Sequence, residues 1–240
     1  MATSSIRLPF VVTRRFYIGV SLLIATMAFV GFWPTYFGPL LGGTVDVVPV
    51  LHFHATVFVG WLFLFVSQAV FAGTGHIRLH RKVGKIGIYY GFALVPVGLF
   101  TAFSMFASRV QAGLMDDARL GLLAPLTDMI AFPAFFSAAV IYRNKPEIHK
   151  RLMVVATTVL LVAAIGRMRF LGTPVPLHLF LLVWFMPIFA AMAYDFLTKR
   201  LIHPVYIIGL SGLFILRLRD LLEESEAWTQ ISSWLAQFFV

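Results

Sequence analysis

The sequence predicts an all-α integral membrane protein: a helical bundle of about seven transmembrane helices, followed by an amphipathic C-terminal helix. Of the 240 residues, 60% are hydrophobic and only 12% are charged, a balance outside the usual range of soluble domains. The apolar residues form runs of membrane length. Lys and Arg lie in short segments between these runs, so topology explains the net charge of +9 better than nucleic-acid binding does.

Each run is long enough, or nearly so, to cross the hydrocarbon core as a helix at about 1.5 Å per residue. A basic arm over residues 1–15 precedes the first run, and no small-residue cleavage site follows that run, so we expect a retained helix. The runs are too long for barrel strands. The seventh run is short, and residues 221–240 form the C-terminal helix. The predicted spans are 16–33, 50–71, 82–105, 120–142, 152–170, 177–197 and 202–216.

The distribution of Lys and Arg predicts the orientation. If the N-terminus is cytoplasmic, 13 of these residues lie in inner segments and 6 in outer segments, which is the bias found in membrane proteins. We therefore expect a cytoplasmic N-terminus and a periplasmic C-terminus in a bacterial inner membrane. The inner residues are Arg7, Arg14, Arg15, Arg78, Arg81, Lys82, Lys85, Arg143, Lys145, Lys150, Arg151, Lys199 and Arg200, and the outer residues are Arg109, Arg119, Arg167, Arg169, Arg217 and Arg219.

The C-terminal segment over 221–240 differs from the spans in its pattern. Three glutamates precede apolar residues that recur at helical spacing: Trp228, Ile231, Leu235 and Phe238. One interpretation is a helix that lies on the outer membrane surface. The other is a helix that docks on a protein partner through this apolar face. The spacing is compatible with both.

Two histidines begin outward-running helices at similar depth. His80 precedes the third span and His149 precedes the fifth, and spans three and five are diagonal neighbours in a four-helix bundle. Without cysteine, facing imidazoles are the standard ligands of a b-type haem. Arg81 and Arg151 lie beside them and are candidates to bind haem propionates, as is Arg167. Alternatively, the histidines contact lipid phosphate or helix ends, and Arg167 snorkels.

A second cluster is expected at the outer face. His54, Asp128 and His178 lie at similar depth in three different spans and are candidate ligands of zinc, copper or iron. The alternative is that Asp128 favours the N-terminus of its helix and pairs with a neighbouring arginine. Asp195 precedes Lys199 by four residues, which predicts an ion pair between them along one helix.

The segments HFHATVFVGW, LHRKVG, EIHKRLMVVAT (with Arg167) and AYDFLTKRLIHP resemble a widespread family of uncharacterised bacterial polytopic membrane proteins. The resemblance covers nearly the whole chain and implies a fold and candidate residues, but no reaction. A weaker resemblance is to transmembrane di-haem cytochromes b of the ascorbate-reductase type, in which four successive helices each supply one histidine. His54, His80 and His149 match that pattern, whereas Asp128 stands where it has histidine. The resemblance therefore implies at most the inner haem, between His80 and His149.

Three functional classes follow from the sequence. The first is a haem b or metal-binding redox protein that transfers electrons. The second is a non-catalytic accessory subunit of a larger membrane complex, and the third is a metal-dependent membrane enzyme that acts on lipid. There is no HExxH, Walker, GxSxG or dinucleotide-binding motif to identify catalytic residues.

Overall fold

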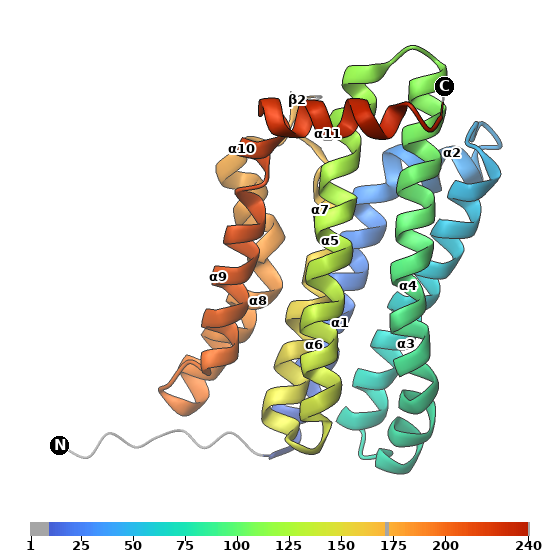
Figure 1. Cartoon of the computed structure of the whole chain (residues 1–240). Coiled ribbons are helices and arrows are strands. Elements are labelled where there is room, and N and C mark those ends of the chain that lie inside the picture. Colours follow the sequence, from blue (N-terminus) through green and yellow to red (C-terminus); the bar gives the residue numbers. More distant parts are fainter. Residues whose placement is uncertain (1–9, 171–172, 240) are drawn as a thin grey trace.

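The computed structural model describes residues 10–170 and 173–239, whose helices run side by side as a bundle (Figure 1). The structure is almost entirely helical, with one pair of two-residue strands. The elements are α1 (Phe10–Phe32), the π-helical turn η1 (Trp33–Phe37), α2 (Gly38–Leu41), α3 (Pro49–Gly73), α4 (Ile77–Gln111), α5 (Met115–Ile141), the 3-10 turn η2 (Tyr142–Asn144), α6 (Pro146–Leu160), α7 (Val162–Ile165), β1 (Arg169–Phe170), β2 (Thr173–Pro174), α8 (Leu177–Lys199), α9 (Pro204–Arg217), α10 (Asp220–Glu223) and α11 (Glu226–Ala236).

The described residues contain six helical segments that are long and apolar enough to cross a membrane. The chain thus has the helices of a polytopic membrane protein, as the sequence predicts. α9 is not among the six, because its 14 residues extend roughly 21 Å, less than the hydrocarbon core of about 30 Å. The six segments are Arg15–Leu41, Pro49–Gly73, Ile77–Gln111, Met115–Asn144, Pro146–Ile165 and Leu177–Lys199.

The central helix of the bundle is α6. Two thirds of its apolar segment (67%) is buried within the protein, against 11–33% for the other five. Every residue from Val154 to Val159 is buried, and these are small or β-branched side chains that let neighbouring helices approach closely. α6 packs against α1, α5, α8 and α9, while α3 and α4 complete the bundle beside α1 and α5. α8 and α9 form an antiparallel pair along its other side (Figure 1).

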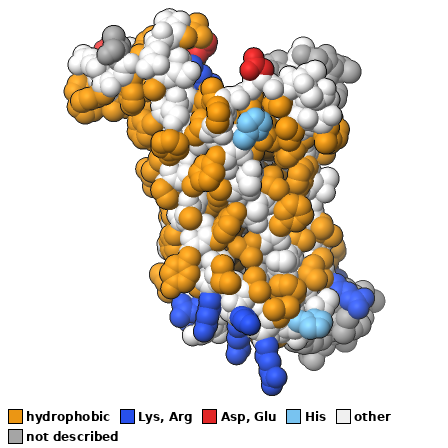
Figure 2. Space-filling view, turned by 90° about the vertical axis from the view of Figure 1, so that its right-hand side faces the viewer, with side chains coloured by type: hydrophobic (Ala, Val, Ile, Leu, Met, Phe, Trp, Pro, Cys, Tyr) orange, Lys and Arg blue, Asp and Glu red, His pale blue; other side chains and the backbone are white. Residues whose placement is uncertain are grey.

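The two ends of the bundle differ in charge. We call the end that holds the α3–α4, α5–α6 and α8–α9 turns the basic end. Figure 2 shows Lys and Arg side chains gathered there, below a side surface covered by hydrophobic side chains. The opposite end carries α2, the α4–α5 loop, α10 and α11 (Figure 1). This arrangement fits helices that cross a lipid bilayer along the axis of the bundle.

Several helix boundaries differ from the predicted ones, and three of them affect the candidate residues. α1 begins at Phe10, so the end of the expected 1–15 arm is already helical, while Arg7 lies outside the described residues. α4 begins at Ile77 rather than residue 82, because Gly75, with a φ of 87°, completes the turn after α3. His80 therefore lies in the first turn of a helix instead of a loop. After α6 the helix continues only to Ile165, which leaves Arg167 beyond its end.

The C-terminal helix is confirmed as α11, but a different face of it is packed. α11 lies across the ends of α4 and α5 (Figure 1). Trp228 is buried there, and its Nε1 donates to the Arg119 carbonyl oxygen at 3.0 Å. Ser232 and Ala236 are buried behind it. Of the predicted apolar face, Trp228 and Leu235 pack on the chain's own bundle, whereas Ile231 and Phe238 are exposed.

Candidate functional sites

The structure brings the imidazoles of His80 and His149 close together at the basic end, in an edge-to-face arrangement. Their ring centres are 6.4 Å apart with an interplanar angle of 78°. His80 Nδ1 donates to the Gln68 carbonyl oxygen at 3.2 Å, and His149 Nδ1 donates to the Ala139 carbonyl oxygen at 2.8 Å. Because a carbonyl oxygen only accepts, both imidazoles carry their proton on Nδ1, and each Nε2 keeps a lone pair. Backbone bonds of this kind orient histidines that ligate metals.

The surroundings of this pair contain an unsatisfied polar group. The amide nitrogen and oxygen of Gln68 are buried, with no hydrogen-bond partner among the described residues. Gly84 lies one turn after His80, and a Cβ placed on it would be 3.1 Å from Gln68 Oε1. A Cβ on Gly87 would be 3.2 Å from Leu64 Cδ2. The space beside the imidazoles is thus filled by the ends of flexible side chains, which can turn aside without moving the backbone.

Two of the three arginines predicted to meet haem propionates have other roles. Arg151 is 1% exposed and forms a bidentate ion pair with Asp195, with Nε–Oδ2 at 3.0 Å and Nη2–Oδ1 at 2.5 Å. Arg167 follows α7, 18 residues after His149, which corresponds to roughly 27 Å of helix, and so lies at the opposite end from the histidine pair. These two predictions are therefore wrong. Arg81 is exposed and stays near His80.

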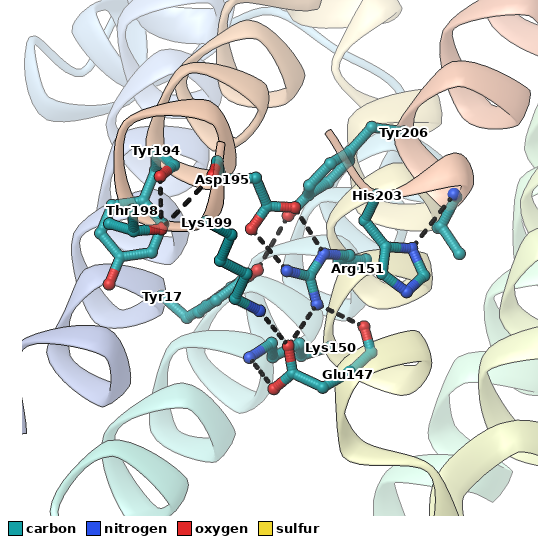
Figure 3. Close-up of polar contacts among 11 residues, drawn as sticks. Tyr17, Glu147, Lys150, Arg151, Tyr194, Asp195, Thr198, Lys199, His203 and Tyr206 are labelled. Atoms are coloured by element: carbon teal, nitrogen blue, oxygen red, sulfur yellow. Dashed lines mark hydrogen bonds and ion pairs between the residues drawn. The ribbon is translucent and has the colours of Figure 1, made fainter. Parts of the chain in front are cut away.

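Figure 3 shows that Arg151 is the centre of a polar network between α1, α6, α8 and α9. Glu147 accepts from Arg151 Nη1 at 2.8 Å, from Lys150 at 2.5 Å and from Lys199 at 2.7 Å. The expected Asp195–Lys199 pair is consequently wrong, because each residue has found a partner on α6. The Asp195–Arg151 and Lys199–Glu147 pairs join α8 to α6, which the spacing of residues within one helix does not predict.

Aromatic side chains and a histidine close this network. The hydroxyl groups of Tyr17 and Tyr206 are 3.0 Å apart, and the Arg151 guanidinium lies 5.5 Å from the centre of the Tyr206 ring. His203 caps α9, since its Nδ1 accepts from the Val205 N–H at 3.3 Å (Figure 3). Burial and the charge of Arg151 lower the pKa of His203. The network is paired on all sides, so we interpret it as structural.

The predicted metal ligands His54, Asp128 and His178 are not gathered into a metal site. Within the described part of the chain, no three His, Asp or Glu side chains come together as metal ligands. Asp128 is buried and pairs with Arg219, which also donates to Thr127 Oγ1 at 2.6 Å. Asp128 thus pairs with an arginine, as the alternative expected, but it lies in the middle of α5, so its expected place at the N-terminus of the helix is wrong. His178 is exposed at the start of α8.

His54 instead lines a large cavity that opens at the opposite end. The cavity has a volume of about 700 Å³, and every long helix of the bundle contributes to its wall. The buried Nδ1 of His54 has no hydrogen-bond partner among the described residues, and its ring stacks on Phe58 with centres 4.2 Å apart. Arg167 lies on the same cavity, where burial and the charge of Arg109 lower its pKa.

Several residues at these sites could not be assigned from the sequence. Arg219 follows a short apolar run and gives no sign that it reaches Asp128, 91 residues earlier. Trp61 and Trp184 lie inside spans, which signals a need for indole partners. Trp184 donates to the Thr158 carbonyl oxygen at 2.8 Å. Trp61 Nε1 has no hydrogen-bond partner among the described residues.

No protein-family model, no curated protein and no solved structure matches this chain.

Proposed function

We propose that the protein crosses a bacterial inner membrane seven times, with a cytoplasmic basic end. The Lys and Arg bias supports this orientation. α9 returns along α8 from the basic end, and α11 then covers the opposite end (Figure 1). A helix of 14 residues crosses if the bilayer thins locally or if the flanking arginines reach the interface.

Topology reporters test this proposal. A reporter that is active only in the periplasm, fused after Val240, should be active, and the same reporter fused after Arg200 should be silent. A cytoplasmic reporter gives the reverse pattern. Cytoplasmic activity after Val240 would show that α9 does not cross.

We further propose that the protein is a membrane redox protein that holds a b-type haem between His80 and His149. The observation that carries this proposal is the pair of neighbouring imidazoles, 6.4 Å apart, with both Nδ1 atoms bound to backbone carbonyls. Two rings that share one metal through Nε2, at about 2 Å per bond, have centres roughly 6 Å apart. The separation of the two rings therefore matches that of two histidines that would hold one haem iron.

The residues next to the pair also suit a cofactor. Gly84 and Gly87 present no side chain, and the groups facing them, Gln68 and Leu64, are flexible. The unsatisfied Gln68 amide would gain a hydrogen-bonding partner, and Arg81 is the arginine left to pair with a propionate. A haem here supplies one-electron transfer. His80 and His149 would hold it, and their backbone hydrogen bonds would fix the ring orientation.

The test is an absorption spectrum of protein produced with ample haem. We expect a Soret band that disappears in His80→Ala and in His149→Ala, with unchanged membrane insertion. His76→Ala is the matched control, because His76 lies in the same turn and bonds to Thr74 at 2.8 Å instead. A colourless wild-type protein would refute the haem, and metal analysis of the same sample would then show whether the pair holds a bare metal ion.

A second candidate function is that of an accessory subunit, favoured by the outward face of α11. Ile231, Trp234 and Phe238 are 50%, 56% and 66% exposed, which is unusual for large apolar side chains at one helix face. Trp234→Ser with Phe238→Ser should reduce the mass of a complex extracted in mild detergent, while Leu221→Ser, a change at an exposed leucine outside α11, should not. A wild-type particle that contains one chain only would exclude this function.

A further inference from the structure

The cavity at the opposite end has the dimensions of a ligand site. Its volume of about 700 Å³ falls within the roughly 300–1,000 Å³ typical of small-molecule sites. Along α3 its wall runs from Leu51 to Leu62, a rise of roughly 16 Å, or about half of a hydrocarbon core. Most of the wall is apolar, with Phe29, Phe32 and Phe58 among its aromatic members.

Polar atoms without partners lie in this apolar wall. Trp61 is 2% exposed and Thr157 is 1% exposed, and neither Trp61 Nε1 nor Thr157 Oγ1 has a hydrogen-bond partner among the described residues. His54 Nδ1 is unpaired in the same way. The Nε atoms of Arg217 and Arg219, on the same cavity, are also unpaired among the described residues. Buried polar groups are nearly always satisfied, so these orphaned groups point to an occupant that carries polar atoms.

Four arginines line the cavity, and two of them differ from the others. Arg219 pairs with Asp128, and Arg217 pairs with Asp220. Arg109 and Arg167, unlike Arg217 and Arg219, have uncharged partners in the described contacts: backbone carbonyl oxygens and an aromatic ring. Arg109 Nη1 donates to the Asp117 carbonyl oxygen at 3.3 Å. Arg167 Nη1 donates to the Ala163 carbonyl oxygen at 2.7 Å, and its guanidinium lies 4.9 Å from the centre of the Phe32 ring.

Arg109 and Arg167 line the same cavity. Burial and the charge of Arg109 lower the pKa of Arg167. Two cations kept together at an apolar cavity are stabilised when an anion binds between them. Gly121 supports the position of one of them: a Cβ on that residue would collide with Arg109 Nη1, so the glycine lets the guanidinium lie against α5.

We propose that this cavity binds a single-chain anionic lipid, with its head group at Arg109 and Arg167 and its acyl chain in the apolar interior. The polar oxygens next to the head group would then meet His54, which is the orphaned group nearest the start of α3. The acyl chain would extend past Trp61, roughly 10 Å deeper along α3. The positive charges of Arg109 and Arg167 favour an anionic head group, and the volume of the cavity favours a lipid with a single acyl chain.

Binding to the purified full-length protein in a neutral detergent tests this proposal, by native mass spectrometry or by thermal stabilisation. The probes are lysophosphatidylglycerol and the monoacylglycerol with the same acyl chain, which lacks the phosphate. We expect the anionic lipid to bind at least roughly tenfold more tightly, as for the loss of charge-assisted hydrogen bonds. Oleate distinguishes a carboxylate site from a phosphate site, and inorganic phosphate alone should bind weakly, since it leaves the apolar wall empty.

Substitutions locate the site. Arg109→Gln and Arg167→Gln should each weaken lysophosphatidylglycerol binding by roughly tenfold and leave monoacylglycerol binding unchanged. Arg143→Gln is the matched control, because Arg143 is exposed like Arg167, donates to a backbone carbonyl, that of Val140 at 3.2 Å, and lies at the basic end. Neither Arg109 nor Arg167 is fully buried, so both variants should fold.

Two results would overturn the proposal. One is equal binding of lysophosphatidylglycerol and monoacylglycerol, and the other is an effect of Arg143→Gln on binding equal to those of Arg109→Gln and Arg167→Gln. The haem proposal is independent. His80→Ala should bind the lipid as the wild type does, so loss of the Soret band and loss of lipid binding separate the two sites.

Discussion

The basic end and the opposite end both hold arginine side chains, but these side chains have different partners. At the basic end Arg151 has Asp195 and Glu147 as partners, and Glu147 also receives Lys150 and Lys199. At the opposite end Arg109 and Arg167 face a cavity with neutral partners. A buried cation that is fully paired holds helices together, whereas cations at an apolar cavity with orphaned polar atoms are poised for a ligand. Identical residue types thus serve structure at one end and binding at the other.

The largest effect on stability should follow from removing the carboxylate partner of Arg151 at the basic end. Asp195→Ala leaves Arg151 buried without its bidentate partner and should lower the free energy of unfolding by about 3–5 kcal/mol. Thermal unfolding in detergent, followed by tryptophan fluorescence, measures it. Asp46→Ala, at an exposed loop carboxylate, is the control and should have little effect. A wild-type unfolding curve for Asp195→Ala would mean that the network contributes nothing to stability.

The next effect concerns the wall of the cavity, where α1 meets α7. A Cβ on Gly31 would collide with the backbone carbonyl of Ala164, whereas a Cβ on Gly19 would meet nothing within 4 Å. Gly31→Ala should therefore cost about 1–3 kcal/mol. Gly19→Ala, in the same helix, should be neutral or stabilising by up to about 1 kcal/mol. Urea-induced unfolding compares the two, and equal stability would refute the close contact.

A smaller effect is expected at His203, beside the paired network. Burial and Arg151 hold its pKa below the ordinary value of about 6.5. Folding therefore favours the neutral ring that caps α9, and this contribution is present above about pH 6.5 and lost as the pH falls through the lowered folded pKa.

Replacing His203 separates the cap from the titration. His203→Ala should cost about 1 kcal/mol at neutral pH, as for other lost caps. His203→Asn should restore the cap without the titration, so its stability should depend less on pH between 7 and 5 (roughly the range around a histidine pKa). Hydrogen exchange of the first turn of α9 reports on both variants, and an identical pH dependence for wild type and His203→Asn would contradict the assignment.

The smallest effect on stability should come from replacing Arg167 at the opposite end. Arg167→Gln, without lipid, should change the free energy of unfolding by no more than about 0.5 kcal/mol, because no buried carboxylate is stranded and the repulsion by Arg109 is relieved. Added lysophosphatidylglycerol should stabilise the wild type more than this variant. A large loss of stability without lipid would show that Arg167 is a structural residue like Arg151.

Local sequence determined much of this protein. Long apolar runs predict the six membrane-length helices because a helix is the way for a single segment to satisfy its own backbone in lipid. The apolar spacing after Glu226 predicts α11, because a helical face is a property of neighbouring residues. The sequence also predicts the shared depth of His80 and His149, since this depth depends only on where two helices begin.

Tertiary structure decided which residues meet. The sequence predicts Lys199 as the partner of Asp195, yet Arg151, 44 residues away, takes that place. Asp128 is bound by Arg219, 91 residues later, and not by a metal with His54 and His178. The packed face of α11 likewise depended on where Trp228 meets α5. Helical periodicity places a side chain on a face of its own helix, but the rotation and neighbours of that helix follow from the packing of the whole bundle.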